Sequence, residues 1–193
     1  MAEARLAAHQ KKARRKGLDI VFFDEFGFSF LESLGRTWAP RGHRPVLRRV
    51  SRDRRALSTA VGLTLSGKIY KRQFAGSMDS ADVITTLKHL QHFLPVGFVL
   101  IWDGARIHTS QVTQGYLADH PEIVVEPLPT YAPELNPEEF CHGTIKQRLK
   151  NALPTDKAQM RVLLERGFAR LRRRPDLLLS FVHAAGLAVN QLW

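Results

Sequence analysis

Three acidic side chains that are far apart in the sequence stand where a metal-dependent reaction could use them. Asp24 and Asp103 each follow an apolar run, and Glu139 falls just after the expected start of a helix. Converging carboxylates repel one another unless a cation offsets their charge. Mg²⁺ takes carboxylate oxygens, keeps water positions open for substrate phosphates, and in pairs clamps the attacking and leaving oxygens of a phosphodiester. These residues therefore predict metal-assisted phosphoryl transfer.

The segment around the third carboxylate has strong local signals. Asn136 is a good N-cap, Pro137 suits the first helical position, and Glu139 completes a pattern like a capping box. An alternative is that Glu139 only caps the helix and interacts with its dipole. Helical spacing places Glu139 on a basic face with Lys146 and Lys150. Glu138 instead lies on the apolar stripe, and it remains a second candidate for the third acidic position. That stripe comprises Cys141, Ile145 and Leu149.

The elements that must position these residues follow from hydrophobic periodicity. Buried or alternating apolar runs predict strands over 18–23, 56–65, 68–74, 97–102 and 122–126. Helical periods and caps predict helices over 80–93, 109–117, from 137 onward, 155–173 and 175–190. The first strand is expected to end at Asp24. Antiparallel strands followed by alternating strands and helices indicate the α/β class, with a mixed five-stranded sheet flanked by helices and two helices at the C-terminus.

Length and composition limit the partners. The chain has 193 residues, a formal net charge of +11 and one cysteine, Cys141. An excess of positive charge this large indicates a polyanionic partner, and nucleic acid is the first expectation. A lone cysteine and the lack of an apolar leader or membrane span fit a cytoplasmic protein.

A basic insertion between the first two expected strands is the candidate phosphate-binding region. We expect it to lie beside Asp24, although a solvated surface loop is an equal alternative. Lys146, Lys150 and His108 are further candidates, and His108 could instead orient a metal ligand or be a hydrogen-bonded histidine near a helix start. The guanidinium groups of the insertion that we expect to bind DNA belong to Arg41, Arg44, Arg48, Arg49 and Arg52.

Three motifs around these acidic residues resemble those of DDE transposases of the mariner-like superfamily, in the branch found in bacterial insertion sequences. The motifs are Phe23-Asp24-Glu25, Trp102-Asp103-Gly104-Ala105-Arg106-Ile107-His108, and Tyr131-Ala132-Pro133-Glu134-Leu135-Asn136-Pro137-Glu138-Glu139. The third is the most specific, and its Leu-Asn-Pro-x-Glu pattern selects Glu139. Gly104 departs from the asparagine that is common in the family at that position.

The resemblance implies a ribonuclease H-like catalytic domain over 18–152, preceded by a basic arm over 1–17 and followed by a helical extension over 153–193. It implies that Asp24, Asp103 and Glu139 are catalytic and hold Mg²⁺ or Mn²⁺ as two ions. The implied reaction is cleavage of DNA at a transposon end and strand transfer into target DNA. The implied partners are transposon-end and target DNA and a second copy of the chain in a homodimer on DNA. Localisation would be cytoplasmic, in a bacterium and associated with the nucleoid.

Two features keep other functions open. Family members usually carry an N-terminal helix-turn-helix region, and the stretch before Leu18 is too short to form one. The expected explanations are one reading frame of a split element, with a separate polypeptide that supplies the region, or a truncated copy. A catalytically decayed or domesticated nucleic-acid-binding module is the main alternative function, and another ribonuclease H-like nuclease is the third. Structural zinc is disfavoured because His89, His92, Cys141 and His142 lack the spacing of known zinc sites.

Overall fold

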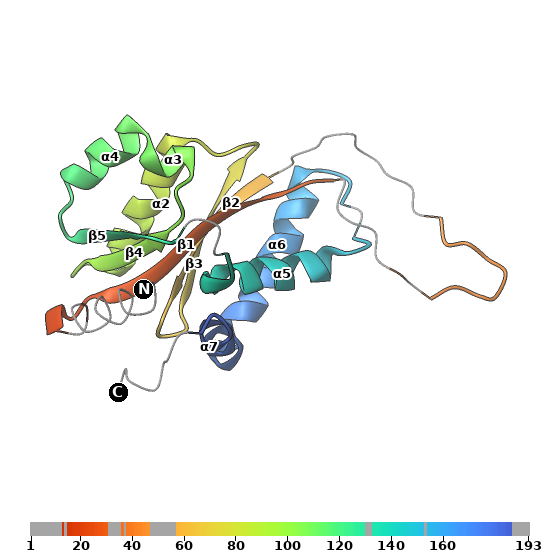
Figure 1. Ribbon diagram of the computed structural model, residues 1–193. Coiled ribbons are helices and arrows are strands. Elements are labelled where there is room, and N and C mark those ends of the chain that lie inside the picture. The colour runs from red at the N-terminus through yellow and green to blue at the C-terminus, as the bar shows by residue number, and fades with distance from the viewer. Residues whose placement is uncertain are drawn as a thin grey trace.

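A single mixed sheet organises the protein (Figure 1). The computed structural model describes residues 13, 15–30, 36, 38–46, 57–129, 133–152 and 154–186. Its five strands lie in the order β3-β2-β1-β4-β5. The strands are β1 (Asp19–Phe28), β2 (Leu57–Thr64), β3 (Ile69–Ala75), β4 (Phe98–Trp102) and β5 (Ile123–Pro127). The first three pair antiparallel, whereas β1, β4 and β5 pair in parallel, which confirms the predicted mixed five-stranded sheet.

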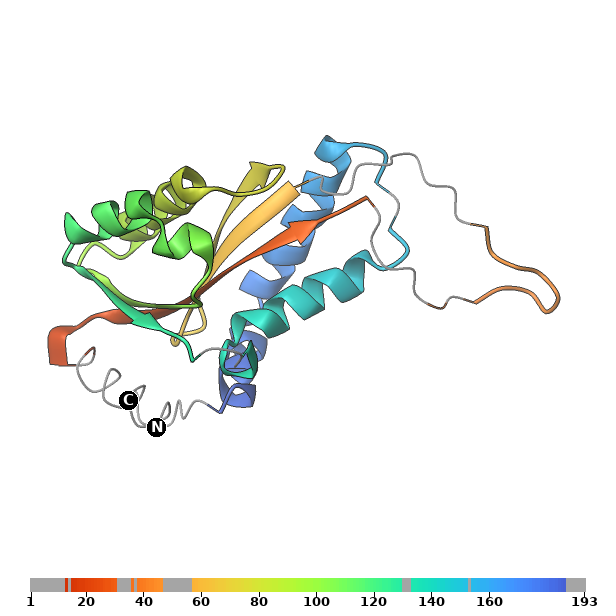
Figure 2. The same cartoon turned by 45° about the horizontal axis from the view of Figure 1, so that its top comes forward.

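Helices cover both faces of the sheet, as Figures 1 and 2 show from two directions. The helices are α2 (Ser80–Phe93), α3 (Arg106–Thr109), α4 (Gln111–Ala118), α5 (Glu138–Leu149), α6 (Lys157–Arg172) and α7 (Pro175–Ala184). A 3₁₀ turn, η1 (Pro133–Leu135), leads into α5. One face carries α2, α3 and α4, and the other carries α5, α6 and α7.

The alternation of side chains along β1 supplies both layers of the core. Phe22 packs with apolar residues of α5, α6 and α7, whereas Val21 and Phe23 pack with those of α2. Ala13, from the end of the basic N-terminal segment, is also buried in the layer that contains Phe22. All eight residues of β2 and all five of β4 are buried, as expected of strands covered on both faces. No helix among the described residues is long and apolar enough to cross a membrane.

The boundaries differ from the predictions in several places. The helix predicted over 109–117 is α4, and the short helix α3 that precedes it was not predicted. β1 continues to Phe28, so the expectation that it ends at Asp24 is wrong: antiparallel pairing with β2 carries it onward. α5 begins at Glu138, one residue later than predicted. The last two helices are shorter than predicted, because they span Lys157–Arg172 and Pro175–Ala184. The end of the second predicted C-terminal helix, from 187 onward, lies outside the described residues.

A glycine at the start of β4 generates the first prediction. Gly97 has φ +106°, and a Cβ there would fall well inside van der Waals contact with the carbonyl oxygen of Glu122. Gly97→Ala should therefore lower the free energy of unfolding by at least about 2 kcal/mol, measured by urea denaturation. The matched control is Gly115→Ala in α4, where a Cβ meets nothing within 4 Å. The control should be neutral or stabilising by up to about 1 kcal/mol, and equal losses in both variants would contradict the steric argument.

Candidate active site

The adjacent parallel strands β1 and β4 bring Asp24 and Asp103 to one cavity. β1 pairs with β4 only as far as Phe22, so Asp24 lies just beyond the end of that pairing, on the part of β1 that continues along β2. Asp103 directly follows the last residue of β4. Both aspartates line a cavity of about 450 Å³. The end of β4 therefore creates the space that the two carboxylates share.

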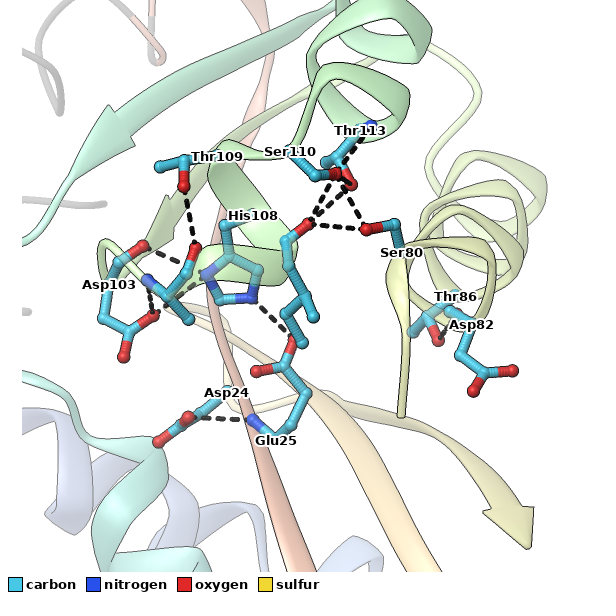
Figure 3. A network of polar contacts seen from close by, with 12 residues as sticks. Asp24, Glu25, Ser80, Asp82, Thr86, Asp103, His108, Thr109, Ser110 and Thr113 are labelled. Atoms are coloured by element: carbon cyan, nitrogen blue, oxygen red, sulfur yellow. Dashed lines mark hydrogen bonds and ion pairs between the residues drawn. The ribbon is translucent and has the colours of Figure 1, made fainter. Parts of the chain in front are cut away.

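A buried histidine fixes the side chain of Asp103 (Figure 3). His108 is only 1% exposed, and its ring stacks on Trp102 with centroids 4.1 Å apart. Its Nδ1 lies 2.9 Å from Asp103 Oδ1, and its Nε2 lies 2.7 Å from Oε1 of Glu25. The backbone N–H of Ala105 donates to the same Asp103 oxygen at 3.0 Å. Burial lowers the pKa of His108, but Glu25 and Asp103 outweigh that effect and raise it. The chain Glu25–His108–Asp103 thus holds one carboxylate at the cavity.

Asn136 connects the start of α5 to β1. Its side-chain oxygen accepts the backbone N–H of Glu138 at 3.1 Å, so it satisfies a free donor at the helix start, although the N-cap position is taken by Pro137 and not by Asn136 as predicted. Its side-chain nitrogen donates to Asp24 Oδ2 at 3.4 Å. The same amide therefore caps the helix and positions the aspartate. Because α5 starts at Glu138, the residue that follows it, Glu139, is held near Asp24.

His142 lies on α5 between three carboxylates. Its Nδ1 is 3.7 Å from Asp24 Oδ2 and 3.8 Å from Glu139 Oε2. Its Nε2 is 2.6 Å from Oε2 of Glu138, whose side chain is fully buried. One ligand atom each from Asp24, Glu139 and His142 lie within 4.8 Å of one another, a grouping that could hold a metal ion. Asp103 does not belong to this group, but it lines the same cavity as Asp24.

Burial and mutual repulsion set the charge states of this cluster. Burial raises the pKa of Asp24 to about 7, although the nearby His142 lowers it and the neighbouring glutamates raise it further. Burial lowers the pKa of His142, but Glu138, followed by Glu139 and Asp24, raises it to about 9. Contact with His142 lowers the pKa of the half-exposed Glu139. At neutral pH a positive imidazolium thus offsets part of the carboxylate charge.

Comparison with known proteins identifies the family of the chain. The sequence matches the DDE superfamily endonuclease family over residues 19–161. The chain belongs to this family. No curated protein sequence matches it at a comparable level.

Solved structures agree on the fold of this DDE endonuclease domain. The Mos1 mariner paired end complex with Mn has a TM-score of 0.66 at 18% identity, over 97% of this chain and 62% of that chain. The Mos1 strand transfer complex gives 0.64 at 18% identity, over 97% and 61%. The catalytic domain of Mos1 mariner transposase gives 0.57 at 17% identity, over 97% and 93%. This likeness confirms the ribonuclease H-like fold, and the chain spans about 60% of the longer Mos1 chains.

The structure places the other residues that were predicted to bind DNA as follows. Lys146 on α5 and Lys150 just after its end are exposed, and Arg41 and Arg44 are exposed in the segment 38–46. His108 is buried with both ring nitrogens engaged, so it orients Asp103 and is not available to contact phosphate. The remaining predicted DNA-binding residues, Arg48, Arg49 and Arg52, lie outside the described residues.

Two contributions were missed by sequence reasoning. Glu25 holds His108, and His142 joins Asp24 and Glu139 with Glu138 behind it. The sequence did contain a signal for the role of His142. This histidine lies three residues after Glu139 and four after Glu138, and side chains at these spacings are neighbours on a helix. Glu138 fits the predicted apolar stripe because it is buried there together with the histidine that partners it.

The raised pKa of Asp24 predicts how metal binding depends on pH. A divalent ion needs the ionised carboxylate, so protons compete with the metal below about pH 7. Calorimetric titration of Mn²⁺ should show affinity falling about fivefold between pH 7 and pH 6 and approaching about tenfold per pH unit below that, as the ionised fraction of Asp24 falls. Asp24→Asn should abolish both the binding and this dependence, whereas Asp119→Asn at the end of α4 should change neither. An affinity that is constant over this range would exclude Asp24 as a ligand.

Proposed function

We propose that this chain is the catalytic domain of a DNA transposase that cleaves a phosphodiester at a transposon end and transfers the freed 3′-hydroxyl to target DNA. The observation that carries the proposal is the placement of Asp24, Asp103 and Glu139 around the end of β4, in a chain of the DDE endonuclease family. The matching Mos1 structures include a paired-end complex with a transposon end and a strand transfer complex, which supports DNA as the substrate.

The residues present fit divalent cations. Asp24 and Glu139 offer oxygens on the α5 side, and Asp103 offers its carboxylate on the β4 side of Asp24. We therefore propose that Asp24, Asp103 and Glu139 would together hold two ions. When bound, Mg²⁺ or Mn²⁺ would activate the attacking oxygen and stabilise the leaving oxygen. This donor set of hard carboxylate oxygens suits either ion.

The protein's own groups fix geometry in advance of substrate. Asn136 holds Asp24, and the buried His108 holds Asp103, so neither carboxylate must be reoriented when DNA arrives. Direct attack by water and then by the 3′-hydroxyl needs no side-chain nucleophile. Cys141 is unsuited to that role because burial, together with Glu138, raises its thiol pKa.

Recognition of transposon ends belongs to a longer assembly in this proposal. The chain matches about 60% of the longer Mos1 chains, so a further domain or a separate polypeptide would supply the helix-turn-helix contacts. Two copies of the chain would act together on paired ends as a homodimer. The proposed place of action is the nucleoid of a bacterial cytoplasm.

Loss of Asp103 tests the chemistry. Asp103→Asn should reduce Mg²⁺- or Mn²⁺-dependent nicking and strand transfer by at least about 10³-fold, because one of the three metal-binding carboxylates is lost. Measurement uses end-labelled transposon-end DNA with the helix-turn-helix partner supplied, and Asp119→Asn serves as the control. Equal activity in wild type and Asp103→Asn would overturn the catalytic assignment. DNA binding without metal-dependent cleavage in the wild type would favour the decayed binding module.

A basic face of α5 is proposed to hold the DNA backbone. Lys146 Nζ lies 5.9 Å from the ring centroid of Phe26, and that ring contacts His142 with centroids 3.6 Å apart. Lys146 is also close enough to Glu139 to lower the pKa of that carboxyl. Exposed Lys150 continues the same face. Together with Arg41, Arg44 and the arginines at 48, 49 and 52, this face would bind phosphates without reading sequence.

The salt dependence of DNA binding tests that face. Each phosphate neutralised contributes about −0.9 to the slope of log K against log salt on duplex DNA. The double variant Lys146→Ala/Lys150→Ala should therefore flatten the slope by up to about 2 and weaken all sequences alike. Lys88→Ala on α2, across the sheet, is the matched control and should leave the slope unchanged. If both proteins give the wild-type slope, the basic face of α5 does not contact the backbone.

A further inference from the structure

We propose that His142 is a nitrogen ligand of the metal ion held by Asp24 and Glu139, and that the buried carboxylate of Glu138 orients it for that role. This inference rests on the proposed function, because it concerns the same metal site. It adds a ligand that the three acidic residues alone do not provide. It also predicts which divalent ion the site prefers.

The first argument is the position of Nδ1. It lies 3.7 Å from Asp24 Oδ2 and 3.8 Å from Glu139 Oε2. These separations are too long for hydrogen bonds. They are close to the spacing of ligand atoms that share one ion, since atoms about 2.1 Å from a metal stand roughly 3–4 Å from one another. The nitrogen therefore faces the position where the two carboxylates would hold a cation.

The second argument is the partner of Nε2. Glu138 Oε2 lies 2.6 Å from it, and the Glu138 side chain is completely buried. A carboxylate there favours a proton on Nε2, so a cation that binds would displace the proton of Nδ1 and take the lone pair of that atom. Histidines that bind metals commonly set their second ring nitrogen against a carboxylate, and such a contact orients the ring and strengthens the ligand.

The third argument is that the ring is held firmly. His142 is 3% exposed, and its ring packs on Phe26 with centroids 3.6 Å apart. The i,i+4 spacing on α5 sets Glu138 directly behind it. An ion pair with Glu138 needs only the contact at Nε2. The other ring nitrogen lies beside Asp24 and Glu139, the two carboxylates that would share the ion.

An imidazole ligand changes the metal preference of the site. Carboxylates suit Mg²⁺ and Mn²⁺, whereas imidazole suits the transition metals, and Mg²⁺ strongly prefers oxygen ligands. The site with His142 should therefore bind Mn²⁺ in preference to Mg²⁺. Replacing the nitrogen should reduce that preference.

The experiment measures coordination directly. Mn²⁺ is bound to the purified chain, and pulsed electron paramagnetic resonance is used to detect nitrogen coupled to the ion. Wild type should show ¹⁴N modulation that changes to the ¹⁵N pattern when only histidine is ¹⁵N-labelled. Both ring nitrogens of His108 are already engaged, so the coupled histidine would be His142. This comparison needs no variant and so does not depend on a variant folding.

A matched pair of variants assigns the residue. His142→Gln places an amide near the position of Nε2, so Glu138 keeps a donor while Nδ1 is removed. His183→Gln on α7 is the control, because that histidine is exposed and outside the cluster. His142→Gln should lose the nitrogen coupling and bind Mn²⁺ about tenfold or more weakly by calorimetry, with a smaller loss for Mg²⁺. The control should match wild type in both measurements.

The outcomes separate this inference from the proposed function. Mn²⁺ binding that requires Asp24 but shows no histidine nitrogen in the wild type would overturn the role of His142 and leave the transposase proposal standing. Nitrogen coupling that persists in folded His142→Gln, judged by circular dichroism, would also overturn it. Absence of any Mn²⁺ binding to the wild type would overturn both.

Discussion

Crowding of like charges at the end of β4 is the constraint on which the rest of the structure depends. Asp24, Glu138 and Glu139 gather around one histidine, and Asp103 faces the same cavity as Asp24. Removing such groups from water disfavours their ionised forms, and mutual repulsion adds to that cost. Burial accordingly raises the pKa of Asp24 to about 7. A protein tolerates this arrangement when cations offset it, and here His142 and the nearby Lys146 supply positive charge.

The surrounding architecture fixes each acidic group by a different contact. Asp24 takes a hydrogen bond from the cap of α5, Asp103 is held through His108, and Glu139 faces His142. These contacts come from residues at the start of α5, on α3 and within α5, and these helices cover opposite faces of the sheet. On one face α5 packs with α6 and α7, and on the other α3 follows β4 and lies against α2. The two helical layers therefore position the two halves of the site independently.

The sequence by itself determined the order of the main elements and singled out the acidic residues as candidates. Strand and helix periods, the cap formed by Asn136 and the three motifs all depend on residues within a few positions of one another. Local spacing is enough for such features, so the mixed five-stranded sheet and the helix that presents Glu139 could be predicted. The family resemblance supplied the ribonuclease H-like fold and the choice between Glu138 and Glu139.

Only the tertiary structure decided where β1 ends and which residues contact and orient the carboxylates. Pairing with β2 extends β1 to Phe28, and no local signal reports that pairing because the paired residues are at least 29 positions apart in the sequence. The contacts between Glu25 and His108 and between His142 and Asp24 likewise join distant segments. A histidine near a helix start can be a phosphate contact or a buried support, and only burial separates the two roles. Burial is a property of the packed layers, so the sequence could name the acidic residues and His108 as candidates but could not decide the role of His108 or predict the contacts of His142.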